Sequence, residues 1–235
     1  RSGKVAQEFL KDFKGYVQTD GYLGYDFLEQ MADIIHLGCW AHVRRKFVEV
    51  VNATGKDKDG KKKPGSGNVA LEYIGKLYLI EKECADQELK PEQIARERQT
   101  RAGPVLEQFK AWLEKRSPQV PPGSMLGKAI SYTLGQWERL VVYLQDGRLR
   151  PDNNLAENAI RPFVIGRKNW LFAATPAGAH ASAALYSIIE TAKANGLEPY
   201  WYLRYLIERL PKAKTTEEYR ALLPHSVDRS QLEGP

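Results

Sequence analysis

The residues of this chain that could do chemistry gather most densely in residues 151–162, which read PDNNLAENAIRP. We predict that a helix starts there, because the short side chain of Asn153 or Asn154 can cap a helix N-terminus. Glu157 then places a carboxylate in the first turn, with Arg161 one turn later. A carboxylate can bind a metal ion. An acid near a helix start, paired with an arginine four residues on, is also an ordinary solvated ion pair.

A second carboxylate, Asp20, ends a predicted strand at residues 16–20. In α/β folds, ligands bind at the carboxyl ends of the strands, so an acid at this position can be a metal ligand. Acids at strand ends also cap the loops that follow them. The distance between Asp20 and Glu157 along the chain is too large for spacing alone to join them. A helical block between them nevertheless has the pattern of an insertion.

Basic and aromatic residues near these acids could contact a nucleic acid. Arginine suits phosphate because its planar guanidinium offers a fork of donors, and an aromatic ring can stack on a base. A basic helix face is equally often just solvated, and most tryptophans belong to a core. The candidate DNA contacts are Arg44, Arg45, Lys46, Arg161, Arg167, Lys168 and Trp170.

A zinc site is the alternative use of Cys39 and His42, which are three positions apart. Zinc needs four ligands, and only His36 and Cys84 could complete the set. His36 falls within a predicted buried strand, so we do not expect zinc. We expect instead that Cys39, His42, Asn153 and Asn154 support the site structurally.

The composition allows a substantial core and a negatively charged partner. The 235 residues are 43% hydrophobic, and 35 Lys and Arg outnumber 29 Asp and Glu. Two cysteines give no disulfide framework, which fits a reducing cytoplasm. No apolar run reaches the length of a membrane span. The chain begins in mid-pattern at Arg1 without a methionine, and we expect it to be a piece of a longer protein.

Two segments with different patterns of predicted secondary structure must position the candidate residues. Residues 1–52 alternate predicted helices and strands (helices 5–13, 26–32 and 41–52; strands 16–20 and 34–40), which indicates an α/β fold. The nearly all-apolar strand 34–40 is typical of a strand buried on both faces. Residues 69–146 show only helical patterns. We place these helices at 69–88, from Pro91 to a break at Gly103-Pro104, from that break to about Lys115, and at 126–145.

The predicted organisation has five parts. Residues 1–54 form the first part of the core, 55–68 a flexible basic linker and 69–147 a helical insertion. Residues 148–196 return to the core with the acid Glu157 and a small-residue helix at 177–194. Residues 197–235 form a C-terminal helical extension and tail, with a helix at 199–210. The chain as a whole is therefore expected to be α/β but dominated by helices.

Four motifs in order resemble the bacterial transposases of the insertion sequence 66 family. They are QTDGY at 18–22, GCWAHVRRKF at 38–47, DNNLAENAIRP at 152–162 and GRKNWLF at 166–172. The resemblance continues through residues 187–193 and 199–200 to 222–224, so it covers nearly the whole chain.

This resemblance implies a DDE transposase with a ribonuclease-H-like core that a helical insertion interrupts. Asp20 would then be the second acid of the triad and Glu157 the third, and the two would hold Mg²⁺. Two Mg²⁺ ions suit the cleavage of a phosphodiester, since they generate a nucleophile at neutral pH and stabilise the leaving oxygen. The implied partners are transposon-end DNA, further copies of the same protein in the active complex, and helper proteins from the same element.

The first acid of such a triad has no counterpart in this sequence. The nearest acid, Asp12, belongs to the opening predicted helix, and it is too close to Asp20 because a parallel crossover needs about a dozen residues or more. We therefore expect the first acid upstream of Arg1 and a fragment that is inactive by itself. The alternative is a non-catalytic DNA-binding remnant or regulator derived from a transposase.

Overall fold

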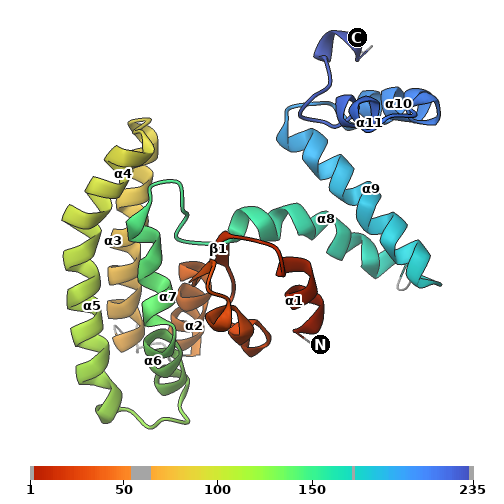
Figure 1. The fold of residues 1–235 in the computed structure, drawn as a ribbon. Coiled ribbons are helices and arrows are strands. Elements are labelled where there is room, and N and C mark those ends of the chain that lie inside the picture. Colours follow the sequence, from red (N-terminus) through yellow and green to blue (C-terminus); the bar gives the residue numbers. More distant parts are fainter. Residues whose placement is uncertain (1–2, 54–64, 171–172, 233–235) are drawn as a thin grey trace, which may run out of the picture. The chain divides into compact units, whose positions relative to one another are not determined.

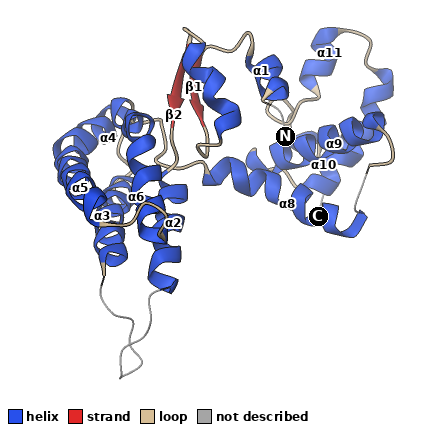
Figure 2. Cartoon of the chain, turned by 90° about the horizontal axis from the view of Figure 1, so that it is seen from below, coloured by secondary structure: helices blue, strands red, loops and turns tan. Residues whose placement is uncertain are grey.

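The computed structural model describes residues 3–53, 65–170 and 173–232, and for Arg167, Lys168 and Trp170 it describes the backbone alone. The chain divides into two compact units, Arg1–Leu155 and Ala156–Pro235, each of which is treated by itself. Figure 1 follows the order of the elements along the chain, and Figure 2 shows that helices dominate. The described ranges contain one pair of strands.

The strand pair confirms the predicted α/β start of the first unit. Strand β1 (Gly15–Gln18) runs parallel to β2 (Ile34–Leu37), and Tyr16 lies opposite Ile35. Both strands are shorter than predicted, so Asp20 lies two residues beyond β1. The connection is a 3₁₀ helix, η1 (Leu23–Gln30), in place of the predicted helix 26–32.

The predicted burial of strand 34–40 on both faces is wrong. Ile35 of β2 is exposed, so the strand is not buried on both faces. The opening helix α1 (Lys4–Leu10) has no buried residue, and Val5 and Phe9 are 78% and 86% exposed. Helical spacing identifies an apolar face, but only a tertiary neighbour buries it.

The helical block contains the predicted helices with different breaks. Gly103-Pro104 does not interrupt the chain of helices, because Pro104 lies in the first turn, where its missing N–H is not needed. A π-helix precedes it, and the predicted helix 126–145 instead divides at Gln136. The elements are α2 (Trp40–Ala53), α3 (Ser66–Asp86), α4 (Pro91–Glu97), the π-helix η2 (Arg98–Ala102), α5 (Gly103–Arg116), η3 (Ser117–Gln119), α6 (Met125–Gly135), α7 (Trp137–Val141) and η4 (Val142–Gln145).

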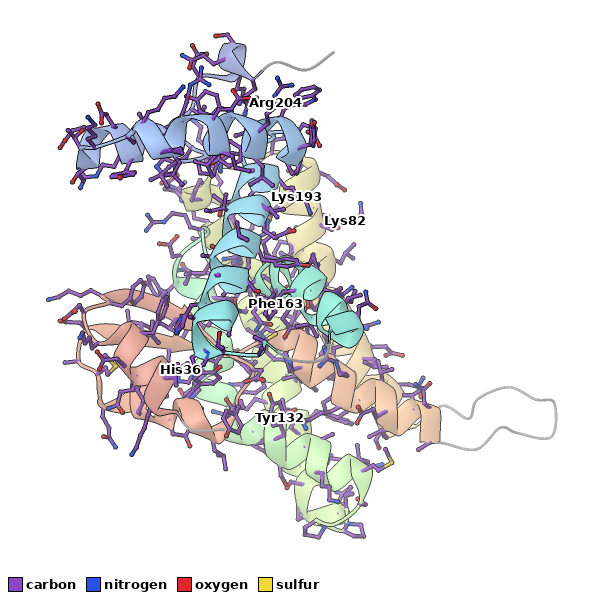
Figure 3. All side chains as sticks on the ribbon, turned by 90° about the vertical axis from the view of Figure 1, so that its right-hand side faces the viewer. His36, Lys82, Tyr132, Phe163, Lys193 and Arg204 are labelled. Carbon is purple, nitrogen blue, oxygen red and sulfur yellow. The ribbon has the colours of Figure 1, made fainter. Side chains whose placement is uncertain are left out.

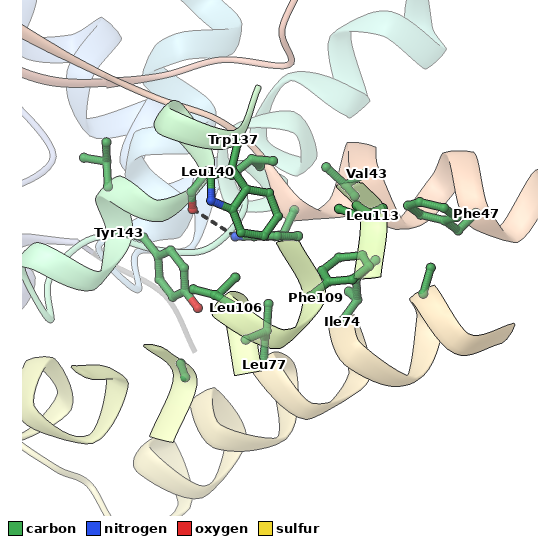
Figure 4. Packing of buried hydrophobic residues seen from close by; sticks show 14 of the residues in the cluster. Val43, Phe47, Ile74, Leu77, Leu106, Phe109, Leu113, Trp137, Leu140 and Tyr143 are labelled. Atoms are coloured by element: carbon green, nitrogen blue, oxygen red, sulfur yellow. Dashed lines mark hydrogen bonds between the residues drawn. The ribbon is translucent and has the colours of Figure 1, made fainter. Parts of the chain in front are cut away.

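One hydrophobic core joins β2 and α2 to the helical block. Trp40 is fully buried, with its ring 6.0 Å from that of Trp137 and 6.2 Å from that of Phe109. Its indole N–H donates to the Leu140 carbonyl at 3.0 Å. Figure 4 shows the surrounding side chains, among them Val43 of α2 and Leu113 of α5. The helical block therefore forms part of the support for the strand ends.

Every regular element in the described part of the second unit is a helix. Helix α9 ends at Ala194 as predicted, and Gly196 follows with φ +68°, a conformation that favours glycine. Tyr202, Leu206 and Leu222 contribute to a separate small core. The elements are α8 (Asn154–Trp170), which begins at the unit boundary, α9 (Pro176–Ala194), α10 (Pro199–Arg209), η5 (Leu210–Lys212), α11 (Thr216–Ala221) and η6 (Arg229–Gln231).

The predicted linker 55–68 lies mostly outside the described residues, since these omit 54–64 and α3 already begins at Ser66. The five predicted parts stay a prediction. Among the helices of the described ranges, none is both long enough and apolar enough to span a membrane.

Candidate active site

Asp20 lies in a tight turn just past the carboxyl end of β1. Its Oδ1 accepts the Tyr22 N–H at 3.0 Å, and its main-chain carbonyl accepts the Tyr132 hydroxyl at 2.7 Å. Gly21 has φ +78°, and a Cβ there would lie 2.9 Å from the Tyr132 oxygen, so this position requires glycine. The turn thus fixes the carboxylate of Asp20 at the strand end that the sequence predicted.

The side chains of Thr19, His36 and Glu29 form a hydrogen-bonded row next to this turn. Thr19 is buried, its Oγ1 accepts the Gly21 N–H at 3.3 Å, and it lies 2.8 Å from His36 Nε2. His36 Nδ1 in turn lies 2.8 Å from Glu29 Oε1. Arg139 approaches the same carboxylate, with its Nε 2.8 Å from Glu29 Oε1. Figure 3 labels His36 and Tyr132 in this region.

Residues 150–154 return to the same strand ends after more than a hundred intervening residues. Gln18, the last residue of β1, donates through Nε2 to the carbonyls of Gly38 and Arg150, each at 3.0 Å. The Trp40 N–H donates to the Pro151 carbonyl at 2.9 Å. The start of α8 is therefore tied to the sheet by main-chain acceptors.

Two side-chain hydrogen bonds complete this attachment. Cys39 donates through Sγ to Asn153 Oδ1 at 3.0 Å, and the Tyr78 hydroxyl donates to Asp152 Oδ2 at 2.7 Å. Burial raises the pKa of the Cys39 thiol, and burial together with the Asp152 hydrogen bond raises the pKa of Tyr78. Both groups therefore stay protonated and can donate at neutral pH.

Helix α8 begins at Asn154, which places Asn153 in the position of the predicted cap, and capping by its side chain stays a prediction. Asp152 accepts the Asn154 N–H at 3.1 Å, while the side chain of Asn153 is engaged with Cys39. An acid at this end also suits the positive end of the helix dipole. Asp152 is not among the predicted site residues. Its position immediately before the predicted helix start is the sequence signal that could have identified it.

Glu157 lies in the first turn of α8, as predicted, and is half-buried. Arg161 follows one turn later and is exposed. Asp20 belongs to the first unit and Glu157 to the second, and their pairing stays a prediction. The side chains of Arg167, Lys168 and Trp170 lie outside the described part of the chain, so their predicted roles stay predictions as well.

The predicted basic helix, α2, divides its three cations between two environments. Arg44 and Arg45 are exposed and line a groove of about 620 Å³, which we call the basic groove. Lys46 instead lies 4.3 Å from the centre of the Tyr132 ring, beside the Asp20 turn. The basic groove is lined by Ala41, Arg44, Arg45, Val48, Gly75, Tyr78 and Asn154.

The donor chemistry at the strand ends suits a hard cation better than zinc. Cys39 is a protonated donor to Asn153, and both nitrogens of His36 are engaged by Thr19 and Glu29. Asp20 offers carboxylate oxygen, which Mg²⁺ prefers. Within the described ranges, no three His, Cys, Asp or Glu residues gather into a metal-binding cluster. Asp20 and Glu157 each offer the type of ligand that Mg²⁺ prefers.

Comparison with known families decides the identity of the chain. Residues 1–181 match the model described as Transposase IS66 family, and residues 187–225 match the IS66 C-terminal element. The chain belongs to the IS66 transposase family. The resemblance carried by the four motifs is thereby confirmed, and this membership supports a transposase-related function.

Curated relatives of this IS66 chain come from Sinorhizobium fredii (strain NBRC 101917 / NGR234). The uncharacterized protein y4jD is 36% identical over 242 residues, which cover 99% of this chain and 45% of the relative. The uncharacterized proteins y4hP and y4qI are each 31% identical, over 94% and 95% of this chain and 41% of their own length. The chain thus spans less than half the length of these relatives. No solved structure matches it.

Proposed function

We propose that this chain is the catalytic region of an IS66 transposase, which cleaves and joins DNA strands at transposon ends with Mg²⁺ in the bacterial cytoplasm. Its fold would be a ribonuclease-H-like core interrupted by the helical block. The observation that carries the proposal is the attachment of residues 150–154 to the strand ends beside Asp20. This attachment supports a site that combines Asp20 with an acid of α8.

In the proposed site, Asp20 and Glu157 would hold Mg²⁺ together with a third acid. When bound, the metal would supply an activated nucleophile and stabilisation of the leaving oxygen. The protein contributes a fixed ligand, because the Asp20 turn is held by Tyr22 from its own loop and by Tyr132 of α6. The assembled complex is proposed to contain several copies of the protein and helper proteins from the same element.

The basic groove is the proposed contact for DNA phosphates in the first unit. Arg44 and Arg45 lie on one face of α2, beside Asn154 at the start of α8. A strand bound there would pass close to the segment that leads into Glu157. Arg161, Arg167 and Lys168 of α8 are proposed to hold phosphates in the second unit, and Trp170 to stack on a base.

The double variant Arg44→Ala/Arg45→Ala is expected to weaken DNA binding nearly equally for all sequences. Because each lost phosphate contact removes one released counterion, the slope of log K against log salt should fall by about 2. Fluorescence anisotropy across a salt series measures it. Lys82→Ala, which removes an exposed cation of α3 paired with Asp86, is the control and should leave the slope unchanged. An unchanged slope in the double variant would remove the groove from the DNA path.

The function itself is tested with the full-length protein and a labelled transposon end. We expect strand cleavage and strand transfer with Mg²⁺, and neither with EDTA. We also expect the 235-residue chain alone to bind DNA without cutting it. DNA binding by the full-length protein without any metal-dependent cleavage would favour the alternative function, a DNA-binding remnant, and would overturn the proposal.

A further inference from the structure

The row formed by Thr19, His36 and Glu29 is not used by the function proposed above. Thr19 and His36 are 6% and 7% exposed. Both lie close to the proposed metal ligand along the fold, because Thr19 precedes Asp20 and His36 lies on the neighbouring strand. A buried polar row of this kind is maintained only if each donor meets an acceptor.

For a neutral imidazole, the proton count of the row has a single consistent solution. Arg139 holds Glu29 as a carboxylate, so His36 must donate from Nδ1 to it. The Nε2 of a neutral imidazole then accepts the Thr19 hydroxyl proton, while Thr19 Oγ1 accepts the Gly21 N–H. All hydrogen bonds therefore point in one direction, from the Asp20 turn toward Glu29.

The electrostatic surroundings are consistent with a neutral ring. Burial lowers the pKa of His36, the hydrogen bond and charge of Glu29 oppose this, and the positive charge of Arg139 lowers it further. Burial acts to raise the pKa of Glu29, but the hydrogen bond from His36 and the charge of Arg139 outweigh it and lower this pKa. Asp26, which also pairs with Arg139 at 3.2 Å, completes the charged groups of η1 that face the ring.

A hydroxyl, an imidazole and a carboxylate in a row also resemble the catalytic arrangement of nucleophilic hydrolases. Access to the hydroxyl excludes that function here. Thr19 is buried, and its hydroxyl oxygen already accepts the Gly21 N–H, so the hydroxyl is not placed to attack a substrate carbonyl or phosphate. The row can act only on the backbone of the turn.

We infer that His36 is a positioning residue, which fixes the Asp20 turn through Thr19 so that the Asp20 carboxylate is held ready for a metal ion. The inference rests on the proposed function for its metal but not for the geometry of the turn. Thr19 and Gly21 flank Asp20 on both sides, so their hydrogen bond sets the path of the main chain at that residue.

The tautomer of His36 is the first test and needs no metal. In the full-length protein with ¹⁵N-labelled histidine, His36 should show a protonated Nδ1 and an unprotonated Nε2 at neutral pH. A protonated Nε2 would reverse the hydrogen bond to Thr19 and overturn the inference.

Amide exchange at the turn is the second test, with Thr19→Val and Thr19→Ser as a matched pair. Valine keeps the shape but loses the hydroxyl, and exchange of the Gly21 and Tyr22 amides should quicken about tenfold. Serine should restore the slow exchange. The Gly127 amide, which donates to the Ser124 hydroxyl at 3.0 Å, is the control for general loosening. Equal exchange in all three proteins would contradict the positioning role.

Metal dependence is the third test. For Thr19→Val and His36→Gln we expect the Mg²⁺ concentration for half-maximal cleavage to rise about tenfold, the lower end of what supporting residues of metal ligands contribute. Thr19→Ser should stay near the parent value. Loss of folded protein would lower the amplitude of cleavage but would leave the Mg²⁺ midpoint unchanged. An unchanged Mg²⁺ midpoint in these variants would therefore overturn the inference.

The two proposals fail in different ways. If the parent protein shows no Mg²⁺-dependent cleavage, the proposed function fails, while the tautomer and amide measurements still decide whether the row holds the turn. If the parent protein cleaves DNA and Thr19→Val retains either its amide protection or its Mg²⁺ midpoint, the positioning inference alone is wrong.

Discussion

Asp20→Asn and Glu157→Gln are each expected to reduce Mg²⁺-dependent strand cleavage by the full-length protein at least about a thousandfold, because each removes a carboxylate that would hold the metal. A metal ion contributes several kcal/mol of charge stabilisation, and each ~1.36 kcal/mol is tenfold in rate. Cleavage of a labelled transposon end under single-turnover conditions measures the loss.

The amide variants separate chemistry from folding. Asn at position 20 retains an oxygen for the Tyr22 N–H, so the turn can persist while the charge is lost. DNA affinity and thermal unfolding should therefore stay close to those of the parent protein. Asp86→Asn, at an exposed acid of α3 that pairs with Lys82, is the control and should cleave normally.

The pattern of the two variants also tests the pairing. Loss of cleavage in both supports one site that contains both acids. Full activity of Glu157→Gln beside an inactive Asp20→Asn would remove Glu157 from the ligand set. Another acid would then have to take the place of Glu157, and Asp152 is the nearest candidate to it in sequence.

Arg98→Met is expected to destabilise the first unit by about 3–5 kcal/mol, the cost of leaving a buried charge without its partner. Arg98 is 2% exposed and opens the π-helix η2. All five of its N–H donors are used. Nε and Nη2 form a fork on the Glu81 carboxylate at 2.8 and 2.7 Å, and the others reach three carbonyls, those of Tyr143, Asp146 and Leu149, each at 2.8 Å.

Arg101→Met is the matched control in the same π-helix. Arg101 pairs with Glu83 and Glu97, but both partners and the arginine itself are substantially exposed. Exposed ion pairs contribute about 0–1 kcal/mol, so this variant should unfold nearly as the parent protein does. Urea denaturation followed by tryptophan fluorescence compares the two variants.

A double variant identifies the source of the loss at Arg98. Glu81→Leu/Arg98→Met removes the uncompensated carboxylate and should recover part of the stability. The remaining deficit would belong to the three carbonyls, which Met cannot satisfy. If Arg98→Met proves as mild as Arg101→Met, Arg98 does not hold the segment that leads into residues 150–154.

The sequence predicted what periodicity and local caps determine. Helices α2, α9 and α10 lie within a few residues of their expected bounds, and Asp20 follows its strand. Helical spacing could not say that the apolar face of α1 is uncovered in its own unit, because burial depends on distant neighbours. The end of β2 at Leu37 was also missed, since the apolar run continues into the first turn of α2.

Long-range hydrogen bonds account for the remaining differences at the candidate site. Local rules place Asn153 directly before a helix, but they do not predict its hydrogen bond with Cys39, 114 residues earlier. Arg98 looks like one more cation of a surface helix, and only its partners Glu81 and the carbonyls of residues 143–149 explain its burial. His36 could have been a zinc ligand by residue type, but both of its nitrogens have partners across the strand ends.

The attachment of residues 150–154 to the strand ends has a consequence for the order of folding. The bond between Cys39 and Asn153 closes a loop of 114 residues, and for a flexible chain such closure costs about 4 kcal/mol of entropy. A folded helical block brings the two ends together beforehand, because α2 and η4 share its core. We therefore expect the strand ends to acquire their second half only after the helices have assembled, which makes the helical block a folding template for the site.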